Sequence, residues 1–226
     1  MERMFARMAL LALAAAPIGA RVTTAGVIRG IVHVSSAHVS APSALHAYPG
    51  HANALPGAAA DPRGAPTDAV VYVESLPAGT DAAVPRGTAM PQLAQKGQRF
   101  VPRVLPVAVG TTVDFPNMDP IFHNVFSLSP VKRFDLGRYP RGHSKRVTFA
   151  TPGLVNVFCD IHSSMAAYVL VLPHHAFAQP DSDGAFTLPD LPSGRYVLHV
   201  WHPDAPEATR SVDVPAAGDV SLEVTL

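Results

Sequence analysis

GLVNVFCDIHSSMAAYVLVL, residues 153–172, contains two runs that predict β-strands on either side of a short loop. Both runs are rich in Val, Leu and aromatic residues, the side chains that strands favour. Cys159, His162 and Met165 lie three residues apart, where the first run ends and in the loop that leads to the second. A loop this short lets the three side chains turn toward one point.

A second histidine completes a set of donors. His123 begins another predicted strand, within FHNVF, and a β-sandwich can bring that strand alongside the one that ends at Cys159. Two imidazoles, one thiolate and one thioether form the donor set of a type 1 copper site. Zinc also binds Cys and two His, but Met is a poor zinc ligand. The residues therefore favour copper, with His123, Cys159 and His162 equatorial and Met165 axial.

The rest of the chain predicts an all-β fold. With 23 Pro and 16 Gly among 226 residues, we expect short strands and turns and no long uninterrupted helices. Strand patterns follow one another from Phe100, with FVPRVLPVAV, a turn at Gly110 and TTVDF, and continue through 122–128 and 144–150. Short strands at this spacing, broken by Gly and Pro, are typical of an antiparallel sandwich or barrel.

Residues 69–172 resemble a cupredoxin, and the spacing of Cys159, His162 and Met165 is similar to that of amicyanin. FVPRVLPVAVGTTVDFPNMDPIFHNVFS and GLVNVFCDIHSSMAAYVLV also resemble plastocyanin-like and methylamine-utilisation-type exported proteins. The resemblance implies a Greek-key sandwich and an electron exit at His162, the ligand nearest the surface. It also implies two residues around the site: Asn124, whose hydrogen bonds tie the ligand loops together, and Phe158, the aromatic residue before the Cys.

Four segments are expected. We predict a signal peptide at 1–25, a strand with an Ala/Pro-rich linker at 26–67, a cupredoxin-like copper domain at 68–173 and a small β module at 174–226. The last resembles a carboxypeptidase-regulatory-like (transthyretin-like) β-sandwich through GAFTLPDLPSGRYVLHVWHP, which implies no catalysis. At about 53 residues it is marginal for an independent core. It therefore packs on the preceding sandwich or recruits the strand at 27–34.

The N-terminus predicts export. Arg3 and Arg7 precede an apolar run and small residues, which are the parts of a secretory signal peptide. The apolar run is shorter than the roughly 20 residues that span a bilayer, and a retained anchor is the alternative. No other stretch is apolar enough to span. The sequence thus predicts a periplasmic or secreted protein with no membrane span in the mature chain.

Charge restricts the partners. Seventeen basic and 17 acidic residues give a net charge of zero, which argues against nucleic-acid binding. The basic residues are unevenly placed, however, and six of them lie between residues 132 and 146. The plain interpretation of this segment is a solvated loop and strand edge. The alternative is a face that docks an acidic redox partner. Its residues are Lys132, Arg133, Arg138, Arg141, Lys145 and Arg146, opposed only by Asp135.

Three classes of function are consistent with these patterns. The first is a one-electron carrier, the second a copper protein that stores or delivers the metal without redox turnover, and the third a structural β-protein with a vestigial site. An enzyme is not expected, because no Ser-His-Asp pattern, phosphate loop or paired-carboxylate motif stands out.

Overall fold

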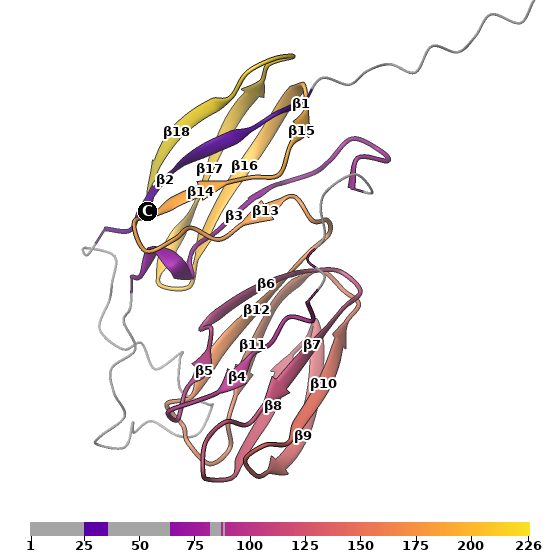
Figure 1. The fold of residues 1–226 in the computed structure, drawn as a ribbon, viewed down its shortest axis with the longest axis vertical. Coiled ribbons are helices and arrows are strands. Elements are labelled where there is room, and N and C mark those ends of the chain that lie inside the picture. Colours follow the sequence, from indigo (N-terminus) through magenta and orange to yellow (C-terminus); the bar gives the residue numbers. More distant parts are fainter. Residues whose placement is uncertain (1–24, 36–63, 82–86, 88) are drawn as a thin grey trace, which may run out of the picture.

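The computed structural model describes residues 25–35, 64–81, 87 and 89–226 (Figure 1). The predicted signal peptide, apart from Ala25, and most of the Ala/Pro-rich linker lie outside these residues. Within them the chain is built from strands and short 3-10 turns such as Pro66–Asp68, so the all-β expectation is confirmed. None of the described helical residues forms a helix long and apolar enough to cross a membrane.

The central unit contains nine strands. A five-stranded sheet in the order β6-β12-β11-β8-β9 packs against the β7–β10 pair, and β4 and β5 form a short hairpin. Phe115, Phe149 and Val157 are among the buried side chains between these sheets. The strands are β4 (Ala94–Gln95), β5 (Phe100–Val101), β6 (Val104–Ala108), β7 (Thr111–Pro116), β8 (His123–Ser129), β9 (Lys132–Tyr139), β10 (Ser144–Phe149), β11 (Gly153–Phe158) and β12 (Ala166–Leu172).

The flanking unit combines both ends of the described chain. One sheet has the order β13-β3-β16-β17 and the other β14-β2-β18, with β1 paired to β15. The unit has its own core, which includes Ile28, Leu191 and Leu198. Its strands are β1 (Ala25–Gly26), β2 (Ile28–His33), β3 (Val70–Val73), β13 (Phe177–Ala178), β14 (Ala185–Thr187), β15 (Leu191–Pro192), β16 (Gly194–His202), β17 (Ala205–Val214) and β18 (Val220–Thr225).

Strand pairing shows how the C-terminal segment completes its sandwich. β2 runs parallel to β18 and antiparallel to β14, so the segment recruits the strand predicted at 27–34. It also takes β3, which pairs with β13 and β16. The boundary predicted at residue 68 is therefore wrong for β3, which lies beside β16 and not in the central unit (Figure 1).

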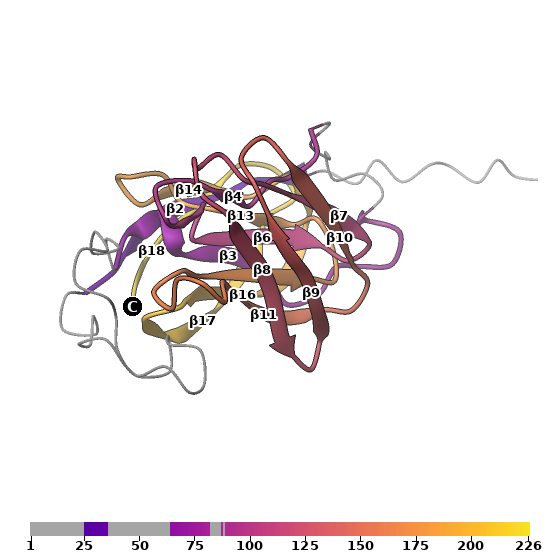
Figure 2. The same cartoon turned by 90° about the horizontal axis from the view of Figure 1, so that it is seen from below.

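β12 joins the two units. Ala167, Val169 and Val171 point into the central core, whereas Tyr168, Leu170 and Leu172 on its other face pack against β3 and β16. Both faces are covered, which is why this strand is apolar at successive positions. Figure 2, viewed from the side of the central unit, shows β8, β9 and β11 in front of the flanking strands.

A buried ion cluster also ties the units together. Arg103, which precedes β6, contacts Asp68 and Asp204 of the flanking unit at 2.8 and 2.7 Å. The three side chains are only 9%, 10% and 6% exposed. The Arg103 guanidinium also lies 5.7 Å from the centre of the Tyr168 ring, which contacts Trp201. The interface is thus both apolar and charge-paired.

Candidate metal centre

The four predicted ligands come from one end of the central unit. His123 is the first residue of β8, Cys159 follows β11, and Met165 immediately precedes β12. Backbone hydrogen bonds from Cys159 N–H to Met165 O and from Met165 N–H to His162 O, of 3.3 and 3.0 Å, close the loop between β11 and β12. Since β12 leads from Met165 to the flanking unit, the site lies at the end of β12 remote from that connection.

A local irregularity accompanies His123. The pairing of β8 with β9 shifts register between Asn124 and Phe126, which marks a β-bulge directly after the ligand. Such bulges bend a strand and redirect its side chains, and they are frequent beside functional sites. His123, Asn124 and Val125 are all buried at this point of the strand.

Three donor atoms surround a single point. His123 Nδ1 lies 3.1 Å from His162 Nδ1 and 3.9 Å from Cys159 Sγ, and His162 Nδ1 lies 4.0 Å from the same sulfur. The centre of this triangle is about 2.1 Å from each atom, close to the metal–ligand distances of imidazole and thiolate sites. In the described part of the chain this is the one cluster of His, Cys, Asp and Glu residues with metal-binding geometry.

Burial distinguishes the ligands. His123 is 0% exposed, and Cys159 and Met165 are 1% exposed, whereas His162 is partly exposed. The site is therefore closed to solvent except on the side of His162. This is the ligand that the resemblance to cupredoxins places nearest the surface.

The thiol of Cys159 is prepared for ionisation. Burial favours its neutral form, but a hydrogen bond from His123 and the backbone N–H groups of Asn124, Ile161 and His162 outweigh burial and lower the pKa of Cys159. A thiolate is the form that binds metal. The surroundings of Cys159 therefore suit a metal-binding thiolate better than an inert core thiol.

The two histidines are affected in opposite directions. Burial opposes protonation of His123, yet its interactions with Cys159 and Asp119 raise its pKa. For His162, burial and the nearby His123 both lower the pKa. His162 is therefore held in the neutral form that binds a metal.

Sequence reasoning missed Asp119. Its carboxylate accepts a hydrogen bond of 2.8 Å from His123 Nε2, the ring nitrogen that faces away from Cys159 and His162. Burial raises the pKa of Asp119, but hydrogen bonds from the Gln98 and Gly97 backbone and from His123 lower it overall. The residue lies four positions before His123, a spacing that carries no signal in a loop.

Of the two residues expected around the site, Asn124 contacts a ligand and Phe158 packs away from the ligands. Asn124 supplies a backbone N–H to Cys159, while its side-chain Oδ1 is buried without a partner among the described residues. Phe158 lies on the opposite face of β11 from Cys159, because side chains alternate along a strand. Its ring packs on Phe126, with 5.9 Å between ring centres.

The six basic residues do not form one patch. Lys132 and Arg133 pair with Ser129 and Leu128, at the end of β8 remote from His123, whereas Arg138 pairs with Asn124. Some of the charges near the site are already engaged: Arg138 with Asp160, Arg146 with Asp114, and Lys145 with the Leu136 carbonyl and the Tyr139 ring. The segment also contains β9, an eight-residue strand that the sequence analysis did not predict.

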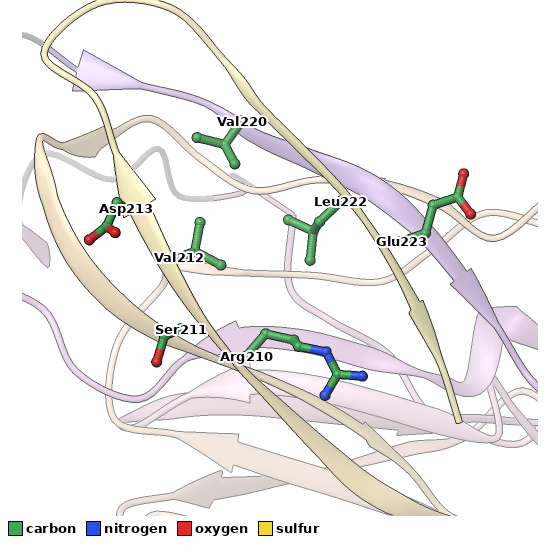
Figure 3. A pocket seen from close by; sticks show the side chains of 7 residues that line it. All are labelled: Arg210, Ser211, Val212, Asp213, Val220, Leu222 and Glu223. Carbon is green, nitrogen blue, oxygen red and sulfur yellow. The ribbon is translucent and has the colours of Figure 1, made fainter.

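A pocket of about 260 Å³ lies on the flanking unit, between β17 and β18 (Figure 3). None of the metal ligands contributes to it. Its walls mix apolar and charged side chains from the two strands: Arg210, Ser211, Val212, Asp213, Val220, Leu222 and Glu223. It lies in a different unit from the metal centre.

Comparisons with solved structures give partial matches. One is a copper-containing nitrite reductase from Thermus scotoductus SA-01, with 25% identity over 43% of this chain and a TM-score of 0.36; the match spans 27% of the reductase. Another is a purple cupredoxin from Nitrosopumilus maritimus, with 22% identity, 36% of this chain, 99% of that chain and a TM-score of 0.34. A third is an amicyanin mutant in its reduced Cu(I) form, with 22% identity, 45% of this chain, 98% of that chain and a TM-score of 0.35. No protein-family model and no curated protein matched the sequence.

The central unit is a β-sandwich that carries the donor set of a type 1 copper centre at one end. Two imidazole nitrogens and a thiolate meet around one point, and Met165, the fourth predicted ligand, is buried in the loop that closes the site. Soft sulfur donors suit Cu(I) and imidazoles suit Cu(II). The residues present fit a copper ion.

Proposed function

We propose that the protein is an exported electron carrier that uses one type 1 copper ion. When bound, the copper would supply a one-electron Cu(I)/Cu(II) couple. The observation that carries the proposal is the convergence of His123, Cys159 and His162 in a site shielded from solvent on all sides but that of His162.

The protein's own contribution is to keep the donors in place. His123 is held by Asp119, and the Cys159–Met165 loop is closed by its own backbone hydrogen bonds. Because the ligands are fixed by contacts independent of the metal, they need to move little when the charge of the site changes. A carrier requires this property, whereas a delivery protein must release its metal.

The surface around the site supports transient docking. Met118, Ile121 and Phe122, in the loop before His123, and Ile161, beside His162, are large apolar side chains that are 36–56% exposed. We call these four residues the apolar rim. Exposed apolar groups surrounded by charge are typical of interaction sites, and weak redox encounters use small interfaces. We propose that a redox partner binds over the apolar rim and exchanges electrons through His162.

Arg141 and Arg138, the latter still 62% exposed beside its ion-pair partner Asp160, are the basic residues that would steer an acidic partner to this rim. Arg138 pairs with Asn124, next to His123, and the turn that contains Arg141 bonds to the rim loop through Gly142 N–H and Asn117 O at 2.8 Å. Lys132 and Arg133 lie six and five residues before Arg138 on β9, roughly 15–20 Å away at about 3.3 Å per residue. Replacing Lys132 and Arg133 therefore serves as a control that changes the same charge far from the metal centre.

For the double variant Arg138→Glu/Arg141→Glu we expect oxidation of the copper-loaded protein by an anionic iron cyanide complex to slow by about tenfold. Electrostatic attraction at this face is replaced by repulsion, and the difference should shrink at 0.15 M salt, where the screening length is about 8 Å. Stopped-flow rates across a salt series measure both effects. Equal slowing by Lys132→Glu/Arg133→Glu, or rates independent of salt, would reject steering by the site-proximal pair.

Two other functions predict different measurements. A storage or delivery protein would bind copper but show no reversible redox wave. A structural protein with a vestigial site would not bind copper stoichiometrically. The closure of the site around His123 and Cys159 favours the carrier.

The flanking unit is proposed as a carboxypeptidase-regulatory-like β-sandwich with a structural role. It packs over β12 and β6 and contributes no metal ligand. Export to the periplasm or beyond, through cleavage of the N-terminal segment, is likewise proposed from the sequence alone. Mass spectrometry of the mature N-terminus in cell fractions tests that proposal.

A further inference from the structure

Asp119 contacts the metal centre without being one of its ligands. Its Oδ2 lies 2.8 Å from His123 Nε2, and the two side chains are 9% and 0% exposed. The other ring nitrogen, Nδ1, faces Cys159 and His162. A neutral imidazole has one N–H, so a metal bound at Nδ1 leaves the proton on Nε2, where it is donated to Asp119.

The carboxylate is itself held from two further directions. The backbone N–H groups of Gly97 and Gln98 donate to Oδ1 and Oδ2, at 2.6 and 2.8 Å. These donors come from the turn between β4 and β5, more than twenty residues away in sequence. Three donors on one buried carboxylate fix its orientation.

The side chain of Asn117 makes three hydrogen bonds that hold the loop containing Asp119. Asn117 is 1% exposed; its Oδ1 accepts from Asp119 N–H at 2.9 Å, and its Nδ2 donates to the carbonyls of Ile121 and Tyr139. The Tyr139 carbonyl belongs to the residue that pairs with His123 in the sheet. Asn117 thus links the Asp119 loop to the same strand pair that holds His123.

We propose that Asp119 is a positioning residue that orients His123 and makes the site favour Cu(II) over Cu(I). The proposal rests on the copper site of the proposed function, although not on any redox partner. A carboxylate that accepts from a ligating histidine increases the basicity of the imidazole. Its negative charge, buried beside the centre, stabilises the more positive oxidation state.

A purely structural role would give a different result. If Asp119 only caps the turn at Gly97 and Gln98, its removal would weaken Cu(I) and Cu(II) binding equally, through disorder of the site. An electrostatic and orienting role weakens Cu(II) binding more. The ratio of the two affinities therefore separates the two roles.

The test uses Asp119→Asn in the full chain, with Cu(II) and Cu(I) affinities measured by competition with chelators. We expect Cu(II) affinity to fall about 10- to 100-fold and Cu(I) affinity to fall less, so that their ratio drops about tenfold. A tenfold change corresponds to a rise of about 59 mV in the one-electron potential. An unchanged ratio, with or without a loss of both affinities, would overturn the proposal.

Asp135→Asn is the matched control. It removes the same charge from the central unit at an exposed position on β9, where Asp135 accepts only a turn hydrogen bond from Gly137 N–H. We expect its affinity ratio to stay that of the wild type. A drop as large as that of Asp119→Asn would show that net charge, and not the contact with His123, controls the ratio.

A measurement on the wild type does not depend on the stability of any variant. In the diamagnetic Zn(II)-loaded full chain, proton–nitrogen NMR of the imidazoles should show His123 protonated at Nε2, with a ring proton that exchanges slowly with water. A rapidly exchanging proton would contradict the bond to Asp119. If the affinity ratio behaves as expected but the copper protein shows no reversible redox wave, the carrier function fails and the role of Asp119 stands.

Discussion

Cys159→Ser is expected to abolish the intense visible absorption of the copper-loaded protein while leaving both units folded. The thiolate is the charge-transfer donor, and a serine hydroxyl is a hard, weakly acidic substitute. The hydroxyl is close in size to the thiol and can accept the hydrogen bonds offered by the Asn124 and His162 backbone. Absorption spectra and far-ultraviolet circular dichroism of the reconstituted variant measure the two effects.

Met165→Leu is the companion variant. It removes the other buried sulfur of the site at similar volume but keeps the thiolate, so the visible band should persist and the reduction potential should rise. A Cys159→Ser protein with an unchanged spectrum would remove Cys159 from the donor set. Loss of copper from Met165→Leu would show that Met165 is more than a weak axial ligand.

Arg103→Met is expected to destabilise the protein by about 3–5 kcal/mol, because it leaves buried carboxylates without their counter-charge. Asp68 and Asp204 both contact the Arg103 guanidinium at the interface between the units. Denaturant titration can follow Trp201, the single tryptophan, which lies in that interface. Arg195→Met, which breaks a solvent-exposed ion pair with Asp213, should change stability little.

The effect of Arg103→Met should depend on pH. Burial raises the pKa of Asp204, but the Arg103 guanidinium more than offsets this and holds the pKa below its usual value. A carboxyl with a lowered folded-state pKa stabilises the protein above its unfolded-state pKa of about 3.9, and this stabilisation is lost as the pH falls through the folded-state pKa. The difference in unfolding free energy between the wild type and Arg103→Met should therefore shrink in acid. The role of the buried cluster would be contradicted if this stability difference stayed constant down to pH 2, or if it were no larger than the difference between the wild type and Arg195→Met.

The metal ligands could be predicted because their signal is local. Cys159, His162 and Met165 share one short loop between two strands, and His123 begins a third strand. Asp119 could not be predicted in the same way, since its role depends on Gly97 and Gln98, which the fold brings from another hairpin.

The unit to which each strand belongs could not always be predicted from the sequence either. The run that forms β3 is equally apolar in either sandwich, and only its pairing with β16 places it in the flanking unit. β9 did carry a signal: Phe134 and Leu136 alternate with charged residues and pack on the central core. The basic residues around Phe134 and Leu136 make this two-residue period hard to recognise in the sequence.

Reconstitution of the full chain with copper is the most direct test of whether the protein is a type 1 copper electron carrier. We expect one copper per chain, an intense visible band that requires Cys159, and a reversible one-electron wave on the same sample. The three signals must appear together, because His123, Cys159 and His162 form a single closed centre. Substoichiometric copper, or stoichiometric copper without the band and the reversible wave, would exclude a type 1 electron carrier.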